Sequence, residues 1–276
     1  MEPACPVCGS PQFSRGPRQY QRCAKCNLLF AMNGKAADAD WYERSWMYKG
    51  HPKAMRAGLA EGVWAWDQFF RLAPLTDGES SLLDVGCGEG RFLNAARQRG
   101  FHVQGLDFNA NCVEAARNLY GVQVVSRDLA SYVTGAEHFD YVTAFEFLEH
   151  TADPVDVLRC LGHLATYVGI SVPCADRRPP LFARGIDDPP HHLTLWTEEA
   201  LRRALIKAGL ETQHVAGNGY SPECLAYYLM GLIGGNYPLH RYVRGTMRRL
   251  GRLLGRFVPV REPRPFTLFA LASSNR

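Results

Sequence analysis

Short apolar runs alternate with amphipathic stretches from Ser80 to the end of the chain. Such runs are typical of buried strands, and apolar residues spaced three or four apart are typical of helices. The pattern predicts seven strands, at residues 81–85, 102–106, 122–125, 139–144, 167–172, 210–216 and 266–273. It predicts helices at 89–99, 109–119, 153–165 and 197–208, with further helix within 222–258. Strands and helices that alternate in this way indicate a doubly wound α/β sheet.

Two shorter regions precede the α/β pattern. Residues 1–33 hold two cysteine pairs among turn residues, and residues 34–78 are rich in aromatic side chains and read as helices and loops. We therefore divide the chain into a small N-terminal module at 1–33, a helical lid or linker at 34–78 and an α/β domain at 79–276. A helical insertion at about 222–260 falls within that last domain.

A glycine-rich loop, DVGCGEG at residues 84–90, follows the first predicted strand, and a helix begins directly after it. Glycine lets the backbone turn sharply and approach a ligand closely, and the free N–H groups of a helix start attract electron-rich atoms. The next two strands end at Asp107 and near Asp128, at the edge where open α/β sheets bind ligands. A carboxylate about 20 residues beyond the glycines is placed to accept hydrogen bonds from the ribose hydroxyls of an adenosine.

The motifs DVGCGEG, GLDFN, SRDL and FDYVTAFEFLEHTADP together resemble those of class I S-adenosylmethionine-dependent methyltransferases, over residues 80–273. The resemblance implies a Rossmann-like, seven-stranded doubly wound sheet with an antiparallel last strand, and S-adenosyl-L-methionine as cofactor. It implies that the glycines bound the methionine part, that Asp107 holds the ribose, and that Asp128 and Leu129 flank the adenine. The expected cofactor-binding residues are Asp84, Gly86, Cys87, Gly88, Gly90, Asp107, Phe108, Asp128, Leu129 and Phe145.

A nicotinamide-dinucleotide-binding domain is the competing interpretation of the glycine loop. Its fingerprint is GxGxxG, because a pyrophosphate must sit over the helix start. Here the third glycine comes one position early, and Asp84 stands within the loop. Glycines that served only a tight turn would leave the two downstream acids unexplained. The sequence therefore favours the methyltransferase.

An acidic and histidine motif, ExxEH, follows the fourth predicted strand and contains Glu146, Glu149 and His150. Residues three and four apart share one face of a helical turn, so these side chains can act together as a general base or as cation ligands. The motif resembles that of quinone-biosynthesis-type O-methyltransferases, a resemblance that implies a bound Mg²⁺. The alternative is that Glu149 and His150 anchor the following helix.

A second histidine motif, PPHHLTLWT at residues 189–197, follows the fifth predicted strand. It resembles the corresponding segment of a bacterial subgroup that acts on small molecules, lipids or glycans. We expect one of its histidines to face the site and choose His192; the alternative is that both imidazoles hold the loop by hydrogen bonds. Because the cofactor's methyl group is already electrophilic, the enzyme must mainly position the acceptor and remove its proton. The expected catalytic residues are His192, His150 and Glu146.

Two CxxC pairs near the N-terminus, Cys5 with Cys8 and Cys23 with Cys26, are separated by 14 residues. This spacing is typical of a zinc ribbon, in which four thiolates surround one structural Zn²⁺. Redox-active pairs are the alternative, which two pairs at this distance disfavour. In some methyltransferases a similar ribbon contacts RNA, and in others it covers a small-molecule pocket, so its partner stays open.

A basic segment lies between Arg241 and Arg264, with eight arginines and one acidic residue, Glu262. Apolar residues recur there at helical spacing, which predicts an amphipathic helix at 241–257. Such a helix can bind an anionic membrane surface, a lipid-linked substrate or an RNA backbone. We favour an ordinary helix packed on the domain with solvated arginines.

The composition is that of an ordinary globular enzyme, and a formal charge of +4 does not by itself predict a nucleic-acid partner. The first residues, MEPACPVCGS, lack a basic start followed by an apolar run, and the longest apolar stretch, Cys224 to Gly235, is too short to span a bilayer. The other five cysteines stand singly in apolar segments, which favours a reducing compartment. We expect a cytoplasmic protein.

These patterns together predict methyl transfer from S-adenosylmethionine to a small-molecule acceptor at an oxygen atom. One alternative is a ribosomal-RNA guanine methyltransferase that uses the ribbon to recognise RNA; the ExxEH and PPHHLTLWT motifs and the small net charge argue against it. The other is a non-catalytic module that binds the cofactor, which the intact glycine loop disfavours. No sequence feature indicates an oligomeric state.

Overall fold

The computed structural model of the chain describes residues 3–32, 34–44, 60–73, 80–176, 188–218 and 266–274. The predicted helical insertion at about 222–260 and the basic helix at 241–257 lie outside these residues. Within the described ranges, no helix combines the length and the apolar character that a bilayer span requires.

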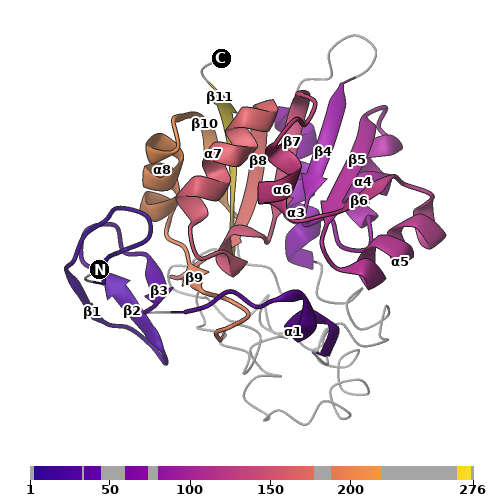
Figure 1. The fold of residues 1–276 in the computed structure, drawn as a ribbon. Helices are drawn as coiled ribbons and strands as arrows, with labels where there is room; N and C mark the ends of the chain where they lie inside the picture. Colours follow the sequence, from indigo (N-terminus) through magenta and orange to yellow (C-terminus); the bar gives the residue numbers. More distant parts are fainter. Residues whose placement is uncertain are drawn as a thin grey trace, which may run out of the picture.

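A seven-stranded sheet forms the centre of the molecule, in the order β10-β11-β8-β7-β4-β5-β6 (Figure 1). The strands β4, β5, β6, β7 and β8 pair with one another in parallel, whereas β11 is antiparallel to both β8 and β10. The bounds are β4 (Ser81–Val85), β5 (His102–Asp107), β6 (Val124–Ser126), β7 (Phe139–Phe145), β8 (Ala165–Pro173), β10 (Leu210–Gly217) and β11 (Thr267–Ser274). The predicted seven-stranded sheet with an antiparallel last strand is confirmed.

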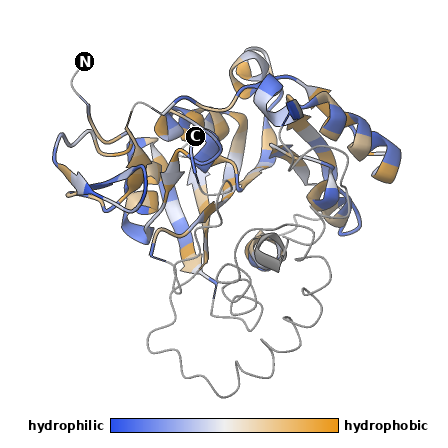
Figure 2. Ribbon diagram, turned by 90° about the horizontal axis from the view of Figure 1, so that it is seen from below, coloured by the Kyte–Doolittle hydropathy of each residue, from blue (hydrophilic) through white to orange (hydrophobic). Residues whose placement is uncertain are grey.

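Helices cover both faces of the sheet, as a doubly wound fold requires. One face is covered by α3 (Ala60–Leu72), α4 (Arg91–Arg97) and α5 (Ala110–Tyr120), and the other by α6 (Leu129–Val133), α7 (Pro154–Leu164) and α8 (Glu198–Lys207). These helices carry both apolar and hydrophilic residues, because one side of each packs on the sheet and the other meets solvent (Figure 2).

Side-chain caps fix where several of these helices begin. Asn109 accepts hydrogen bonds from two backbone N–H groups at the start of α5. Asp153 does the same for one N–H of α7, which has Pro154 in its first turn, and Thr197 caps α8. Each cap satisfies a donor that the helix cannot pair internally.

The aromatic segment before the sheet splits into two described parts. Its second part, α3, packs on β8 and β11, and the ring of Phe69 is fully buried there. A Cβ atom added to Gly169 would lie 2.9 Å from the ring of Phe69, so the helix needs glycine at that point of β8. Its first part, α1 (Ala39–Arg44), lies instead near the carboxyl edge of the sheet (Figure 1).

The N-terminal module forms a second sheet together with a piece of the α/β domain. Its three strands are β1 (Phe13–Arg15), β2 (Tyr20–Cys23) and β3 (Leu29–Ala31), and the fourth is β9 (Thr194–Leu195). Leu29 lies opposite Leu195 and Phe30 opposite Thr194 in the antiparallel pairing of β3 with β9. The module therefore pairs with the segment that follows the two histidines of PPHHLTLWT.

Candidate active site

The glycine loop runs from the end of β4 to the start of α4. The backbone N–H groups of Gly86 and Cys87 both donate to the carbonyl of Leu106 at the end of β5, which ties the loop to the neighbouring strand. A Cβ atom on Gly86 would lie 2.5 Å from the ring of Phe147, whereas one on Gly88 would meet nothing within 4 Å. The backbone at Gly88 is thus open to a ligand.

Asp107 ends β5 directly beside this loop. Its two carboxylate oxygens accept one backbone N–H each, from Gly88 at 2.9 Å and from Asn109 at 2.8 Å. Burial raises the pKa of Asp107, and the two N–H donors oppose that effect. A carboxylate offers about four lone-pair positions, so two stay available for hydroxyl donors. The carboxylate and the open glycine backbone fit the ribose and methionine parts of an adenosyl cofactor.

Asp84 lies deeper, at the end of β4, and only 4% of its surface is exposed. Its Oδ1 accepts a hydrogen bond of 2.7 Å from the hydroxyl of Thr143 on β7. Burial raises the pKa of Asp84 to about 7; the Thr143 hydroxyl opposes this rise, and the charge of Asp107 adds to it. The thiol of Cys87 is also buried, and this raises its pKa.

The residues expected beside the adenine follow β5 and β6. Phe108 is 38% exposed and makes an edge-on ring contact with Tyr42. Asp128 caps α6 by accepting hydrogen bonds from the backbone N–H and the hydroxyl of Ser131, and these two bonds lower its pKa. Leu129 begins α6 and is half-buried. The remaining member of the expected set, Phe145, packs edge-on against Phe92 at 4.7 Å between ring centres.

The ExxEH motif does not form the continuous helical turn that its spacing suggested. Glu146 has a left-handed φ of 51°, and the 3₁₀ turn η1 spans only Leu148–His150. The Oε1 atom of Glu146 accepts a hydrogen bond of 2.9 Å from the hydroxyl of Ser171 on β8. Among the described residues, the groups with ligand atoms close enough for a metal ion are the four cysteines and three histidines, without Glu146 or Glu149. This geometry lends the expected Mg²⁺ site no support.

Three histidines form a compact cluster at the carboxyl edge of the sheet. His150 comes from η1, and His191 and His192 come from the PPHHLTLWT loop; the ring centres lie 4.5 to 4.9 Å apart. His191 and His192 are buried. The Nδ1 atom of His150 lies 2.6 Å from the carbonyl oxygen of His191. Burial lowers the pKa of His150 well below its usual value, and the two neighbouring imidazoles lower it further.

Glu149 stands beneath this histidine cluster and is fully buried. Its Oε1 atom lies 3.9 Å from Nε2 of His150 and 4.0 Å from Nε2 of His192. The carbonyl of Glu149 accepts a hydrogen bond of 2.6 Å from the N–H of Leu193. This bond fixes the PPHHLTLWT loop, called the histidine loop from here on, to η1. The two chain segments that supply the histidines are thereby held together.

Helix α1 joins the histidine cluster to the Asp107 strand end. The ring of Trp41 stacks on His191 with 5.4 Å between centres. Tyr42 contacts His150, His191 and Phe108. Burial raises the pKa of Tyr42, and the charges of Glu149 and Asp107 raise it further. From the sequence, Trp41 and Tyr42 could be assigned only to the aromatic segment at 34–78. The local sequence does not show which of its aromatic rings face the site.

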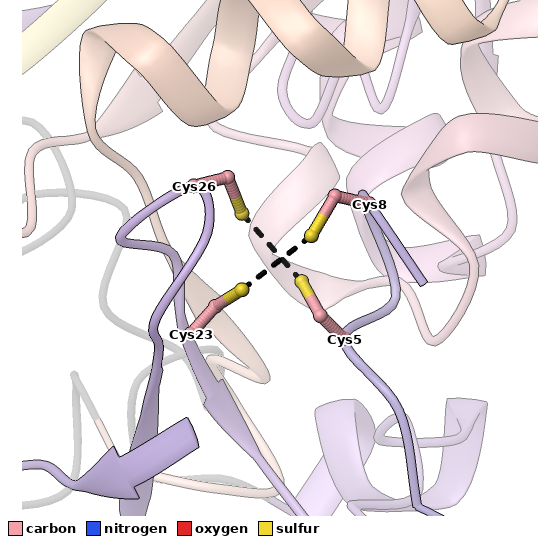
Figure 3. A group of neighbouring side chains, drawn as sticks. All are labelled: Cys5, Cys8, Cys23 and Cys26. Atoms are coloured by element: carbon pink, nitrogen blue, oxygen red, sulfur yellow. Dashed lines mark hydrogen bonds between the residues drawn. The ribbon is translucent and has the colours of Figure 1, made fainter. Parts of the chain in front are cut away.

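The four cysteines of the N-terminal module converge on one point (Figure 3). The Sγ atoms of Cys5 and Cys26 lie 3.6 Å apart, and those of Cys8 and Cys23 lie 3.4 Å apart. Disulfide sulfurs would lie about 2.05 Å apart, whereas Zn–S bonds of about 2.3 Å in a tetrahedron place sulfurs about 3.8 Å apart. The contact between Cys5 and Cys26 lowers the pKa of Cys5 to about 5 and raises the pKa of Cys26, as expected for two sulfurs that share one proton. The thiol cluster fits a zinc ion.

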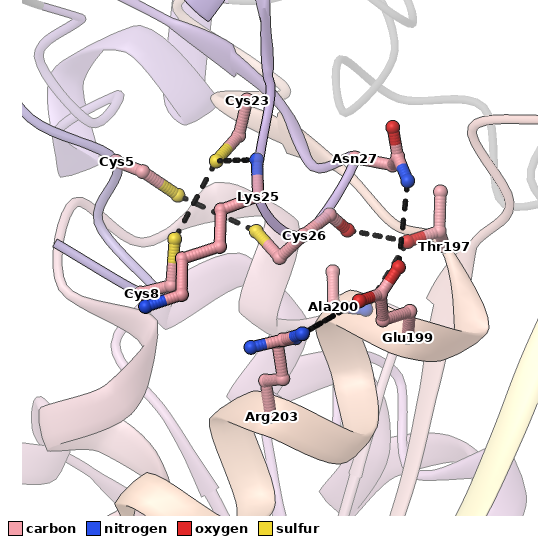
Figure 4. Close-up of polar contacts among 10 residues, drawn as sticks. All are labelled: Cys5, Cys8, Cys23, Lys25, Cys26, Asn27, Thr197, Glu199, Ala200 and Arg203. Carbon is pink, nitrogen blue, oxygen red and sulfur yellow. Dashed lines mark hydrogen bonds and ion pairs between the residues drawn. The ribbon is translucent and has the colours of Figure 1, made fainter. Parts of the chain in front are cut away.

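The N-terminal module with its four cysteines, called the cysteine module from here on, contacts the start of α8 (Figure 4). The hydroxyl of Thr197 donates to the carbonyl of Cys26 at 3.0 Å while it accepts the N–H of Ala200 at 3.1 Å. Farther along the module, the hydroxyl of Tyr20 donates to the carbonyl of His192 at 2.8 Å, in a buried position. Arg18 forms an ion pair of 2.7 Å with Asp188, just before the histidines. The module therefore holds the histidine loop from one side.

Comparisons with known proteins agree with this geometry. The profile of a family described as "Methyltransferase domain" matches residues 60–215. The chain is 31% identical over 177 residues to the ubiquinone biosynthesis O-methyltransferase of Psychrobacter arcticus, a match that covers 56% of this chain and 68% of that protein. It is 31% identical over 182 residues to the enzyme of the same name from Pseudomonas aeruginosa, covering 56% of this chain and 75% of that one.

Solved structures share the fold at lower sequence identity. A SAM-dependent methyltransferase from Archaeoglobus fulgidus superposes with a TM-score of 0.52 at 21% identity, covering 77% of this chain and 94% of that chain. The magnesium protoporphyrin IX methyltransferase of Synechocystis with bound SAM superposes with a TM-score of 0.52 at 14% identity, covering 87% of this chain and 99% of that chain. At such identities the likeness concerns the fold alone.

Proposed function

Because the chain belongs to the family of S-adenosylmethionine-dependent methyltransferases, we propose that it transfers the cofactor's methyl group to an oxygen atom of a small-molecule acceptor. The names of the relatives support transfer to oxygen. The observation that carries the proposal is the position of Tyr42. Its ring contacts Phe108, next to Asp107, and also His150, so the expected ribose site and the histidine cluster face the same space.

The cofactor is proposed to lie along the carboxyl edge of β4, β5 and β6. When bound, it supplies an electrophilic methyl group on a sulfonium. The open backbone at Gly88 would contact the methionine part, and Asp107 would accept hydrogen bonds from the ribose hydroxyls. Phe108 and Leu129 offer apolar surface for the adenine, beside Asp128. Asp84, at the buried end of β4, is proposed to support the cofactor site, and the hydrogen bond from the Thr143 hydroxyl holds its carboxylate in position.

The acceptor hydroxyl is proposed to lose its proton to the histidine cluster. A carbonyl oxygen can only accept, so the Nδ1 atom of His150 must carry the hydrogen that it shares with His191. In the neutral ring the Nε2 atom then holds a lone pair, and the lowered pKa of His150 keeps the ring neutral. His192, whose Nε2 lies at a similar distance from Glu149, is the second proton acceptor. Glu146, held by Ser171, is proposed to orient the acceptor.

Substitution of the histidines tests this assignment. General-base catalysis contributes about 10²- to 10⁴-fold to rate, so His192→Ala and His150→Ala should lower turnover by at least about 10²-fold. Affinity for S-adenosylhomocysteine, measured by calorimetry, should stay within about twofold, because the glycine loop lies on other strands. The control is His163→Ala, since His163 is exposed on α7. Turnover is measured as S-adenosylhomocysteine release with a panel of hydroxylated aromatic acceptors. Unchanged turnover, or an equal loss of cofactor affinity, would remove the histidines from the catalytic set.

The four cysteines are proposed to hold one structural Zn²⁺, within a ribbon at 1–33 that is followed by the linker at 34–78 and the α/β domain at 79–276. The distances between the sulfur atoms support this metal. Metal analysis should show that a Cys8→Ser/Cys23→Ser variant carries one equivalent of zinc less than the unchanged chain. Equal zinc contents would refute the ribbon. Its described contacts are made with the chain's own α8 and histidine loop, which favours a small-molecule acceptor over RNA.

A further inference from the structure

We propose that His150, His191 and His192 bind a divalent transition-metal cation at a second site, separate from the four cysteines. One ring nitrogen of each histidine lies within 4.8 Å of the corresponding nitrogens of the other two. The three rings come from two segments that are adjacent only in the fold. Imidazole nitrogens that converge in this way are a usual ligand set for zinc, nickel, cobalt and iron.

The environment of His150 is that of a metal-binding imidazole. Ligating histidines almost always donate their other ring N–H to a carbonyl or carboxylate, which fixes the tautomer and the ring orientation. The Nδ1 atom of His150 makes such a bond to the carbonyl of His191, at 2.6 Å. The Nε2 atom of the neutral ring therefore carries the lone pair that is available to a metal.

Glu149 lies beside the three nitrogens without joining their group. Its Oε1 atom lies 3.9 Å from Nε2 of His150 and 4.0 Å from Nε2 of His192. Among the described residues, the atoms that converge closely enough for a metal ion here are the three imidazole nitrogens, without a carboxylate oxygen. The buried carboxylate instead places a negative charge close to the bound cation, which favours binding through its charge.

The two ligand-bearing segments are fixed to one another before any metal arrives. The N–H of Leu193 donates to the carbonyl of Glu149, and the hydroxyl of Tyr20 donates to the carbonyl of His192. The ring of Trp41 stacks on His191. A site whose ligands are already oriented loses little conformational freedom on binding, which favours affinity.

The ligand chemistry selects against Mg²⁺. Magnesium prefers six oxygen ligands and keeps several of its waters, whereas this set consists of three imidazole nitrogens. The carboxylate of Glu146, which an ExxEH magnesium site would need, is bonded to the hydroxyl of Ser171 instead. The cation is therefore expected to be of the zinc, cobalt or nickel type.

The activity consequence rests on the proposed function. A metal ion and the acceptor's proton would compete for the same Nε2 atoms of His150 and His192. Saturating the second site should then lower methyl transfer, because the lone pairs that accept the proton are taken. The binding itself can be measured without any acceptor, so failure of the proposed function would not remove this site.

Calorimetric titration of the purified full chain tests the proposal, with ZnCl₂ as probe and MgCl₂ as comparison. The chain should bind one further equivalent of Zn²⁺ beyond the zinc retained on purification, and no Mg²⁺. His192→Ala should weaken this binding about tenfold or more, and Glu149→Gln should weaken it less. The exposed His163→Ala serves as the matched control and should bind like the unchanged chain.

Cobalt supplies a second readout that separates the two sites. Co²⁺ at the added site should show d–d absorption without the sulfur-to-metal charge-transfer band that a four-cysteine site gives. The proposal is overturned if the unchanged, folded chain takes up no metal beyond the cysteine site. It is equally overturned if the added metal shows thiolate bands, or if His192→Ala and Glu149→Gln, folded by circular dichroism, both bind it unchanged.

Discussion

The hydrogen bond between Tyr20 and the carbonyl of His192 should decide how well the histidine loop is positioned. The bond is buried, is 2.8 Å long, and joins the cysteine module to the loop. Tyr20→Phe removes one hydroxyl and leaves the ring packing in place. The carbonyl of His192 would then lose a donor in a buried position, where an unmet acceptor costs about 1–3 kcal/mol.

The expected consequences of Tyr20→Phe follow from that magnitude. Unfolding in urea should show a loss of about 1–3 kcal/mol in the free energy of unfolding. A shift of about 1 Å in a catalytic group can lower a rate about 10²-fold, so turnover should fall between about 10- and 100-fold. Affinity for S-adenosylhomocysteine should not change, because Gly88 and Asp107 belong to the other sheet.

Tyr132→Phe is the matched control for this experiment. The hydroxyl of Tyr132 on α6 accepts a 2.7 Å hydrogen bond from the side chain of Gln104 on β5, at a half-buried position away from the cysteine module. Its removal should lower stability by about 1 kcal/mol and leave turnover unchanged. If Tyr20→Phe lost stability to the same extent as Tyr132→Phe and kept full turnover, the link between the cysteine module and the histidine loop would have no catalytic role.

Three further predictions concern charge, backbone strain and the metal. The pKa of Asp84 is raised from 3.8 to about 7, so its ionisation costs the folded state about 4 kcal/mol. Stability should therefore fall as pH rises from 4 to 7, and urea unfolding of Asp84→Asn, which keeps the oxygen that accepts from Thr143, should show a weaker pH dependence. Glu146→Gly relieves a left-handed φ worth about 1 kcal/mol and loses one hydrogen bond of similar worth, so calorimetry should find stability nearly unchanged while turnover falls. In the Cys8→Ser/Cys23→Ser variant, turnover should be lost while binding of S-adenosylhomocysteine persists; loss of both together would contradict the separation of the two sheets.

The main sheet could be predicted from the sequence because local pattern and fold agree there. Strands β4, β7, β8 and β11 contain short apolar runs, and capping residues such as Asn109 and Asp153 mark where the next helix begins. The ends of the parallel strands then fall at one edge of the sheet, so the sequence could place Gly88 and Asp107 in one site. In the structure the backbone N–H of Gly88 donates to the carboxylate of Asp107 at 2.9 Å.

The second sheet could not be predicted, for two physical reasons. Strand β9 is only two residues long, so it carries no alternation that would mark it as a strand. Its partner β3 lies far away in the sequence, and a pairing across such a distance leaves no local signal. The helical turn expected for the ExxEH motif was wrong for a different reason: the left-handed φ of Glu146 turns the chain before η1 begins.

The arrangement of the two sheets bears on why a catalytic loop should depend on a distant metal. The histidine loop follows a strand of the main sheet, yet His192 is only two residues from β9, which belongs to the sheet of the cysteine module. Long loops have many accessible conformations, and fixing each residue costs about 1–2 kcal/mol. The pairing of β9 with β3 and the bond from Tyr20 offset part of that cost at the residues that carry the imidazoles. A metal that orders the cysteine module would thus order the proton acceptors as well, without touching the acceptor or the cofactor.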